Sequence, residues 1–341
     1  MGRRPRATTT ISDVARECGV STMTVSRVIN GNKSVSAEMA SRVHAAIARL
    51  NYQPNEAARI LRGQSSRTIG LLLPNLADTF FSQCAHAVQQ RAAQNGYTTM
   101  IFACEGDRES EAEELTIMRS RNIAGIVLVP SNRKLVPQLR QMRSAGLPIV
   151  MVDRTISGLE AGQVLVENEE GAIMAVNHLI GHGHRHILCT GYDSEYDSVG
   201  KRIQGYRRAM QDAGLEPELL IVDRPEAVRP HLLARMHDPN PPTALFTLNN
   251  VTSTEVLRAL QSEAYPVPDQ VAIVGFDDFE LAPLLAVPLT AVRQPASELG
   301  ECATQMLLDS LSEGSHSSSK TVILPTRLII RNSCGCISHG R

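Results

Sequence analysis

The segment "DVARECGVSTMTVSRVINGN", residues 13–32, decides the fold of the N-terminal region. It holds two short amphipathic stretches separated by a Gly-Val-Ser. Gly19 is suited to end one helix in a left-handed conformation, and Ser21 is suited to cap the next. The sequence therefore predicts a helix over about 11–18, a tight turn, and a second helix over about 22–29.

Capping residues and apolar spacing extend this region to three helices. Thr10 and Asp13 match a capping box at the start of the first helix. Ser36 can cap a third helix that continues to about Leu50. Side chains at helical spacing should form one small shared core: Ile11, Val14, Ala15, Cys18, Val25, Val28, Ile29, Met39, Val43, Ile47 and Leu50.

The second helix is polar on the face away from this core. A helix-turn-helix places its second helix in the major groove of DNA, where side chains must reach base edges. Arg27 could bind guanine with two hydrogen bonds, and Met23 could contact a thymine methyl group. The alternative is an ordinary surface helix with small polar residues. We expect DNA contacts from Ser21, Thr22, Met23, Thr24, Ser26, Arg27 and Asn30.

Positive charge is concentrated in the same region. Residues 1–67 carry 11 Lys and Arg against 4 Asp and Glu, whereas the rest carries 23 against 31. A basic head suits a phosphate backbone, although a solvated charged surface would have the same composition. We expect Arg3, Arg4 and Arg6 to contact phosphates.

From residue 68 onward, short apolar runs alternate with amphipathic stretches. The runs are TIGLLLP (68–74), TTMIFA (98–103), AGIVLVP (124–130), PIVMVD (148–153), RHILCT (185–190), ELLIVD (218–223), TALFTL (243–248) and VAIVGFDD (271–278). This alternation is typical of parallel sheets flanked by helices. The two groups of four runs predict two similar α/β subdomains, with a ligand cleft beyond the carboxyl ends of the strands.

The overall composition is that of an ordinary globular protein. The chain has 341 residues, of which 43% are hydrophobic and 20% charged, which is enough for two or three domains. No stretch resembles a signal peptide or a membrane span, so we expect a cytoplasmic protein with no membrane partner. The seven cysteines, an odd number, suggest reduced and mostly buried thiols.

Three segments follow one another as in a known family: "TISDVARECGVSTMTVSRVINGN", "ARLNYQPNEAARILRG" and "IGLLLPNLADTFF". The chain resembles the lactose-repressor (LacI/GalR) family of bacterial transcription regulators from about residue 10 to its end. The resemblance implies an all-α helix-turn-helix domain and a core like that of periplasmic binding proteins. It also implies a homodimer that binds a pseudo-palindromic operator in double-stranded DNA and is controlled by a small-molecule effector. No leucine heptad follows Cys334, so we expect a dimer without a coiled-coil tetramer.

The implied domain boundaries combine this resemblance with the pattern of the chain. Residues 1–54 form the DNA-binding domain, 55–67 the hinge helix and linker, and 68–341 the ligand-binding and dimerisation core. Within the core, the N-subdomain takes about 68–167 and 293–324, and the C-subdomain about 168–292 and 325–341.

The hinge has features of its own. Pro54 breaks the chain, and the helix predicted over 56–62 is too short to persist alone in water. In the resembled family such a helix folds on DNA and inserts a leucine into the minor groove, where unstacking is offset by contacts to bent DNA. By this resemblance we expect DNA contacts from Asn55, Ala58, Leu61 and Arg62.

Polar and aromatic residues gather near the predicted strand ends. By resemblance to the family's pocket, we expect the effector to contact Phe81, Arg202, Asn249 and Asp277 and, as weaker matches, Phe80, Arg154, Glu170, Ser198 and Asn250. Carboxylates, amides, an arginine fork and an aromatic face suit a polyhydroxylated ligand, although each residue alone is more often a loop cap or a structural ion pair. Aspartates common in the family are replaced in Glu167-Asn168 and Asn249-Asn250, so the family's ligands do not transfer directly. The low aromatic content favours a sugar or sugar derivative over a purine.

Metal and enzyme chemistry receive little support from the sequence. His178 and His182 would share a helical face, with His184 and His186 nearby, but we expect no cysteine or carboxylate to be placed to complete a site. Cys334 and Cys336 are spaced too tightly to suggest a metal site by themselves. We expect no metal and no cofactor.

The sequence contains no common catalytic motif. No nucleophile elbow, phosphate-binding loop or zinc-protease motif is present, so we expect no enzymatic activity. The alternatives are a catabolite-control-type global regulator with a phosphoprotein co-effector, and a sugar-binding protein that does not bind DNA.

Overall fold

The computed structural model describes residues 9–29, 35–52, 66–104, 108–131, 133–192, 197–313 and 320–336. The chain divides into two compact units, Met1–Ser66 and Arg67–Arg341.

The first unit holds the three predicted helices. They are α1 (Ile11–Cys18), α2 (Thr22–Ile29) and α3 (Ala37–Leu50). The capping box of Thr10 and Asp13 is confirmed, as is the left-handed Gly19 with φ of 63°. Ser36 caps α3 by accepting a hydrogen bond from the backbone N–H of Met39. The three helices share a core centred on Val14, Val25 and Val43, which are fully buried.

The second unit begins with a six-stranded parallel sheet in the order β11-β5-β4-β3-β1-β2. Its strands are β1 (Thr68–Leu73), β2 (Thr98–Ala103), β3 (Gly125–Leu128), β4 (Ile149–Val152), β5 (Gly162–Val166) and β11 (Thr321–Leu324). Its helices are α5 (Thr79–Gln94), α6 (Arg108–Ser120), α7 (Val136–Ser144) and α12 (Ala296–Glu313), with a 3-10 turn η1 at Arg133–Leu135. We call this the N-terminal lobe.

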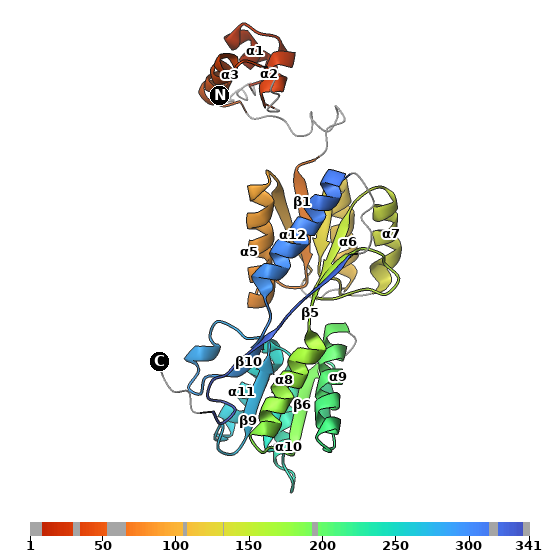
Figure 1. The fold of residues 1–341 in the computed structure, drawn as a ribbon, viewed down its shortest axis with the longest axis vertical. Helices are drawn as coiled ribbons and strands as arrows, with labels where there is room; N and C mark the ends of the chain where they lie inside the picture. The colour runs from red at the N-terminus through yellow and green to blue at the C-terminus, as the bar shows by residue number, and fades with distance from the viewer. Residues whose placement is uncertain are drawn as a thin grey trace, which may run out of the picture. The chain divides into compact units, whose positions relative to one another are not determined.

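Alternation along the strands explains the layers of this lobe. In β1, Ile69, Leu71 and Leu73 pack into the core beneath α5 and α12, whereas Leu72 packs into the core beneath α6 and α7. Successive side chains of a strand point to opposite faces, so a strand covered on both sides must be apolar throughout. Figure 1 shows α5 and α12 beside each other, with α6 and α7 to their right in the same lobe.

The C-terminal lobe repeats this plan with the order β12-β10-β9-β8-β6-β7. Its strands are β6 (Ile187–Tyr192), β7 (Glu218–Val222), β8 (Ala244–Thr247), β9 (Ala272–Phe276), β10 (Thr290–Arg293) and β12 (Arg327–Ile329). Its helices are α8 (Asn168–Gly181), α9 (Asp197–Asp212), α10 (Pro225–Met236) and α11 (Asn250–Ser262), with a 3-10 turn η2 at Ala282–Leu284. Helices α8 and α9 cover one face and α10 and α11 the other. All pairs are parallel except β10 with β12.

The chain passes between the lobes three times: from β5 to α8, from β10 to α12, and from β11 to β12. The predicted fold class, a helical head and two similar subdomains built on parallel sheets, is confirmed, with the antiparallel β12 as an exception. Each of the eight predicted apolar runs contains a strand. Within the described ranges, the helices are too short or too polar to span a bilayer.

Candidate functional site

The first candidate site is the outer face of α2 in the helical head. Ser21 accepts a hydrogen bond from the backbone N–H of Thr24 at 3.2 Å, which holds the start of this helix. Val25 and Val28 point into the core, so the 3.6-residue period turns Thr22, Met23 and Arg27 outward. Met23 is 64% exposed, which is unusual for a large apolar side chain.

The remaining predicted DNA contacts are distributed differently. Thr24 and Ser26 are half-buried on the sides of α2, and Ser21 is exposed. Outside the described residues lie Arg3, Arg4, Arg6, Asn30, Asn55, Ala58, Leu61, Arg62 and the predicted hinge helix over 56–62.

The second candidate site is a cavity of about 370 Å³ between the two lobes of the core. We call it the cleft cavity. Both lobes contribute to its wall, and a volume of this size is typical of small-molecule sites. The predicted effector contacts that line it are Phe80, Phe81, Arg154, Ser198, Arg202, Asn249, Asn250 and Asp277.

Arg202, on α9, organises the C-terminal side of the cleft cavity. The side chain is only 3% exposed. Its Nε donates to Asn168 Oδ1 at 2.8 Å, and Nη1 donates to the Leu248 carbonyl at 2.7 Å and to Asp277 Oδ2 at 3.0 Å. The guanidinium also lies 3.8 Å from the centroid of the Phe276 ring. Arg202 is therefore fixed from several directions.

Two aspartates occupy equivalent positions in the two lobes. Asp153 directly follows β4 and Asp277 directly follows β9, and both have left-handed backbones, with φ of 64° and 68°. Aspartate tolerates this conformation better than most residues, and such strain is found at functional sites. The left-handed residue ends each strand and leaves its carboxylate in the wall of the cleft cavity.

Four carboxylates, Asp78, Asp153, Asp223 and Asp277, line the cleft cavity together with the guanidiniums of Arg154, Arg202 and Arg224. Burial raises the pKa of Asp78, and the charges of Asp277 and Asp153 raise it further. Burial also raises the pKa of Asp153, although the neighbouring charges of Arg154 and Arg202 oppose the change. Arg154 and Arg202 thus offset only part of the cost of burying the Asp153 carboxylate.

Several side chains hold the cleft wall in shape. Asp78 caps α5 through a hydrogen bond from the Phe80 N–H at 2.9 Å, and it also accepts one from Asn250 Nδ2 of the other lobe at 2.9 Å. Asn249 Oδ1 caps α11 by accepting from the Thr252 N–H at 2.8 Å. Asn249 and Asn250 therefore combine structural roles with exposure to the cavity.

The aromatic wall comes from the start of α5. The rings of Phe80 and Phe81 meet edge to face, with centroids 5.1 Å apart. The Arg154 guanidinium lies 5.8 Å from the centroid of the Phe81 ring. This arrangement provides an apolar surface beside a cation.

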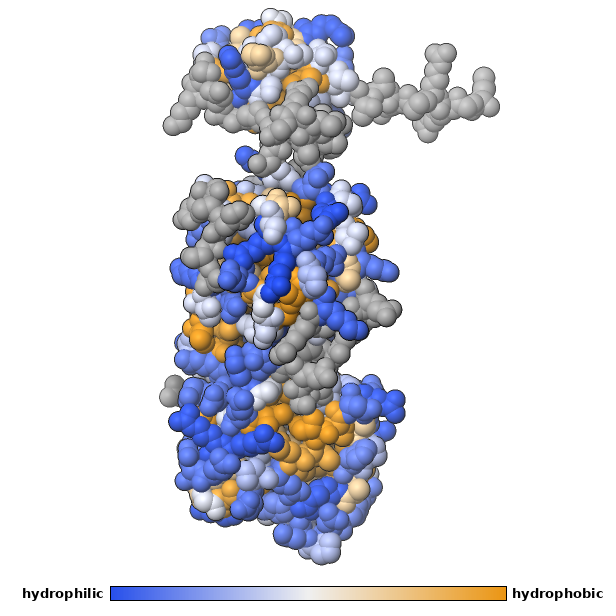
Figure 2. Space-filling view, turned by 90° about the vertical axis from the view of Figure 1, so that its right-hand side faces the viewer, coloured by the Kyte–Doolittle hydropathy of each residue, from blue (hydrophilic) through white to orange (hydrophobic). Residues whose placement is uncertain are grey.

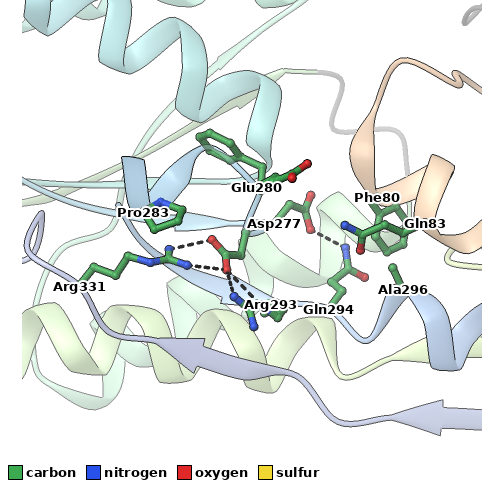
Figure 3. A pocket seen from close by; sticks show the side chains of 11 residues that line it. Phe80, Gln83, Asp277, Glu280, Pro283, Arg293, Gln294, Ala296 and Arg331 are labelled. Atoms are coloured by element: carbon green, nitrogen blue, oxygen red, sulfur yellow. Dashed lines mark hydrogen bonds and ion pairs between the residues drawn. The ribbon is translucent and has the colours of Figure 1, made fainter. Parts of the chain in front are cut away.

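An adjoining cavity of about 490 Å³ shares Phe80, Asp277 and Gln294 with the cleft cavity. Figure 3 shows Gln294 donating to Asp277, and Arg293 and Arg331 converging on one carboxylate. That carboxylate is Asp278, which accepts from both arginines at 2.6 to 3.0 Å. Burial by itself would raise the pKa of Asp278, but these hydrogen bonds hold it below its usual value.

One predicted effector contact, Glu170, lies apart from the others. Glu170 lies in the first turn of α8 with an exposed side chain, and it does not line the cleft cavity. Asn168, two residues earlier, is buried and accepts a hydrogen bond from Arg202. Asp78, Asp153 and Gln294 also line the cleft cavity and were not predicted from the sequence, although the capping position of Asp78 before α5 could have indicated it.

The prediction that no cysteine is placed to complete a site around the histidines is wrong. The segment after β12 places Cys334 and Cys336 against His178 and His182 at the end of α8. Antiparallel pairing of β12 with β10 brings this distant segment back beside α8. His184 and His186 are not in the group: His184 contacts Thr243, and His186 contacts Glu218.

Comparisons with known proteins match both units of the chain. Residues 10–55 match the model of bacterial regulatory proteins of the lacI family, and residues 176–334 match a periplasmic binding protein-like domain. The transcriptional repressor PurR of Vibrio campbellii is 31% identical over 340 residues, covering 95% of this chain and 98% of that protein.

Two solved structures show the same architecture. One is the Lac repressor dimer bound to operator and the anti-inducer ONPF, with a TM-score of 0.83 and 25% identity, covering 96% of this chain and 99% of that one. The other is the transcriptional regulator CelR in complex with cellobiose, with a TM-score of 0.70 and 27% identity, covering 95% and 99%. The chain therefore belongs to the lacI family of bacterial regulatory proteins and is a DNA-binding transcription regulator with a ligand-binding core.

Proposed function

We propose that this regulator binds a neutral, polyhydroxylated molecule, a sugar or sugar derivative, in the cleft cavity, and that occupancy changes its affinity for operator DNA. The observation that carries the proposal is a set of buried acceptor atoms. Asp153 Oδ1 and Gln294 Oε1 are buried, and neither accepts a hydrogen bond from the described residues. Buried acceptors without donors are costly, and the hydroxyl groups of a sugar would supply the missing donors after the Asp153 and Gln294 side chains turn toward the ligand.

The charge of the cleft cavity favours a neutral ligand over an anion. Four carboxylates (Asp78, Asp153, Asp223 and Asp277) and three guanidiniums (Arg154, Arg202 and Arg224) line it, so there is no excess of positive charge for a phosphate or carboxylate, and Arg202 is already paired with Asp277 at 3.0 Å. The rings of Phe80 and Phe81 offer an apolar face for the C–H groups of a pyranose or furanose. The complex of the relative CelR with cellobiose supports the same ligand class.

Contacts between the lobes suggest how occupancy is transmitted. Asn250 donates to Asp78 at 2.9 Å, and Thr155 donates to Asp197 at 3.2 Å, so each bond joins one lobe to the other. A ligand that competes for Asp78 or bridges the same groups would change how the lobes close. Coupling of this kind is typically worth about 1 to 3 kcal/mol, a change of about 5- to 150-fold in affinity.

The DNA-binding surface is proposed to be the outer face of α2, with Thr22, Met23 and Arg27 reaching base edges. Arg3, Arg4 and Arg6 would bind phosphates, and the hinge residues Asn55, Ala58, Leu61 and Arg62 would enter the minor groove.

A homodimer fits the surface of the core. The edge strands β2 and β7 occupy equivalent positions in the two sheets and carry half-exposed apolar side chains, among them Ile101, Phe102 and Leu220. Figure 2 shows apolar side chains gathered on one face of the C-terminal lobe. Pairing of two copies would cover such surface, and the solved Lac repressor relative is a dimer on its operator.

The proposal is tested by a thermal-shift screen of the full chain against neutral sugars, sugar phosphates, sugar acids and nucleobases. A ligand present at 100 times its Kd should stabilise the core by about 2.7 kcal/mol. The ligand found in this screen should then change the affinity of the chain for operator DNA. The direction of that change shows whether the ligand releases DNA or promotes its binding. Shifts confined to nucleobases, or to anionic sugars, would contradict a neutral sugar ligand.

A pair of variants localises the binding. Asp153→Asn should weaken binding of this ligand by at least about tenfold, because it replaces a buried acceptor oxygen by a donor. Asp212→Asn, at an exposed position on α9, is the matched control and should bind normally. Equal binding by both variants would place the ligand elsewhere.

A further inference from the structure

A group of four metal-ligating side chains lies at the far end of α8. His178 is in the last turn of this helix and His182 is its C-cap, so both face the same side at a spacing of one turn. Cys334 and Cys336 lie in the turn that follows β12. We call these four residues the His/Cys cluster. None of the four takes part in the cleft cavity.

The distances within the His/Cys cluster are those of a metal cage. The Nε2 atom of His178 lies 3.2 Å from Cys334 Sγ and 3.6 Å from Cys336 Sγ, and the Nε2 atom of His182 lies 3.0 Å from Cys336 Sγ. All four ligand atoms lie within 4.8 Å of one another. Zinc bonds of about 2.0 to 2.3 Å in a tetrahedron place ligand atoms about 3.3 to 3.8 Å apart. Sub-ångström movements of these side chains would therefore close the cage.

The ligand set selects the metal. Two thiols and two imidazoles form a sulfur and nitrogen site, which suits zinc and disfavours magnesium and calcium, whose ligands are oxygen. Four protein ligands leave no open position, and closed sites of this composition are structural. Cys334 is buried in the core of the C-terminal lobe, while His182 is exposed, so the group sits at the surface with one side anchored.

The surrounding contacts show what such a metal would fasten. Ser333 accepts from the Thr290 N–H at 2.8 Å and donates to the Ile273 carbonyl at 2.7 Å. Ile273 and Thr290 lie at the starts of β9 and β10, the opposite ends of these strands from Asp277. The turn holding the two cysteines thus closes the amino end of the sheet.

We propose that His178, His182, Cys334 and Cys336 bind one zinc ion, which ties the C-terminal segment to α8 and stabilises the C-terminal lobe. The Cys thiols give up their protons on binding and the imidazoles bind in their neutral form. The metal has no part in effector chemistry, because the site is separated from the cleft cavity by the length of α8. That helix has 14 residues, or about 20 Å.

The first test measures metal content. The full chain is purified without a polyhistidine tag from zinc-supplemented medium and should contain about one zinc per chain. His182→Ala and Cys336→Ser change residues at the surface and should each lose the metal. His184→Ala and Cys302→Ser are matched controls, a neighbouring histidine and a partly exposed cysteine outside the group, and should retain it. Zinc bound equally by all four variants, or by none including the parent chain, would overturn the proposal.

A second measurement identifies the ligands. Cobalt titrated into the metal-free chain should produce the visible bands of a tetrahedral ion together with thiolate charge-transfer absorption. Cys336→His should keep the tetrahedral bands with weaker charge transfer, whereas an octahedral spectrum would contradict the assignment. A Cys334–Cys336 disulfide in place of the metal would also overturn it. In the unreduced chain, such a disulfide would lower the measured mass by two hydrogen atoms, that is, two protons and two electrons. Chelation should lower the Tm of the parent chain and leave that of Cys336→Ser unchanged.

Discussion

Replacing Arg202 by methionine tests the centre of the cleft wall. The substitution keeps an unbranched apolar stem but removes the guanidinium that contacts Asn168, Leu248 and Asp277. Asp277 is then left beside the cavity without its main counter-charge. The Gln294 amide still donates to it, but an amide does not neutralise a carboxylate.

The expected loss follows from these contacts. Breaking a buried ion pair by removing one partner costs about 3 to 5 kcal/mol, because the other charge remains desolvated. The hydrogen bonds to Asn168 and Leu248 would add about 1 kcal/mol each if independent, but residues in one network do not add fully. We therefore expect Arg202→Met to lower the free energy of unfolding of the C-terminal lobe by at least about 3 kcal/mol.

Urea denaturation followed by tyrosine fluorescence measures this loss. The chain has no tryptophan, and four of its six tyrosines lie within residues 168–292. With an m value of about 3 kcal/mol/M, the midpoint should fall by about 1 M or more. Arg208→Met is the control on the same helix. Its side chain is 59% exposed, so its ion pairs should contribute less than about 1 kcal/mol.

A double variant separates charge from packing. Adding Asp277→Asn to Arg202→Met removes the stranded carboxylate and should recover part of the lost stability, with a coupling energy of about 0.5 to 3 kcal/mol. The reasoning is refuted if the second substitution destabilises the first variant further, or if Arg202→Met and Arg208→Met have equal effects.

Three further predictions concern other parts of the chain. Gly300→Ala places a Cβ 2.5 Å from a backbone oxygen of α5 and should lower the free energy of unfolding, measured with urea, by about 1 to 3 kcal/mol. Gly200→Ala, in open space on α9, should be neutral or stabilising. Equal effects would show that α12 can shift freely. Arg27→Ala should cost about 1 to 3 kcal/mol on the specific operator and flatten preference at one base pair per half-site, while Arg16→Ala should leave base preference unchanged; uniform losses on all sequences would make Arg27 a phosphate contact. The pKa of Asp278 is lowered from 3.8, so the ionised carboxylate stabilises the fold fully above about pH 5, and this stabilisation is lost as the pH falls through the lowered pKa. Asp278→Asn should therefore make the urea midpoint depend less on pH at acidic pH. An unchanged pH dependence would contradict this.

The helical head was predictable because its signals are local. Capping by Thr10, Gly19 and Ser36 depends on residues within one turn, and each predicted cap is found. The central strands were predictable for a similar reason, since a strand buried on both faces needs an unbroken apolar run. The edge strand β12 has half-exposed side chains and only three residues, so the sequence carries no comparable signal.

The candidate sites were predictable only in part. Comparison with the pocket of the resembled family led to Phe81, Arg202 and Asp277, which line the cleft cavity. It did not identify Gln294, which follows the unpredicted strand β10, and it included Glu170, whose orientation depends on where α8 begins. The His/Cys cluster joins residues more than 150 positions apart, and spacing along the chain holds no information about that proximity.

The late position of α12 has a consequence for synthesis of the chain. This helix covers the same face of the first sheet as α5, and Gly300 lets the two backbones meet closely. On the ribosome, α5 is complete about 200 residues before α12 emerges, which at about 5 to 20 residues per second is an interval of roughly 10 to 40 s. During that interval the apolar surface of α5 and of the neighbouring strands that packs against α12 in the native lobe is exposed to solvent. The nascent N-terminal lobe should therefore be a substrate for chaperones that bind exposed apolar segments until translation is almost finished.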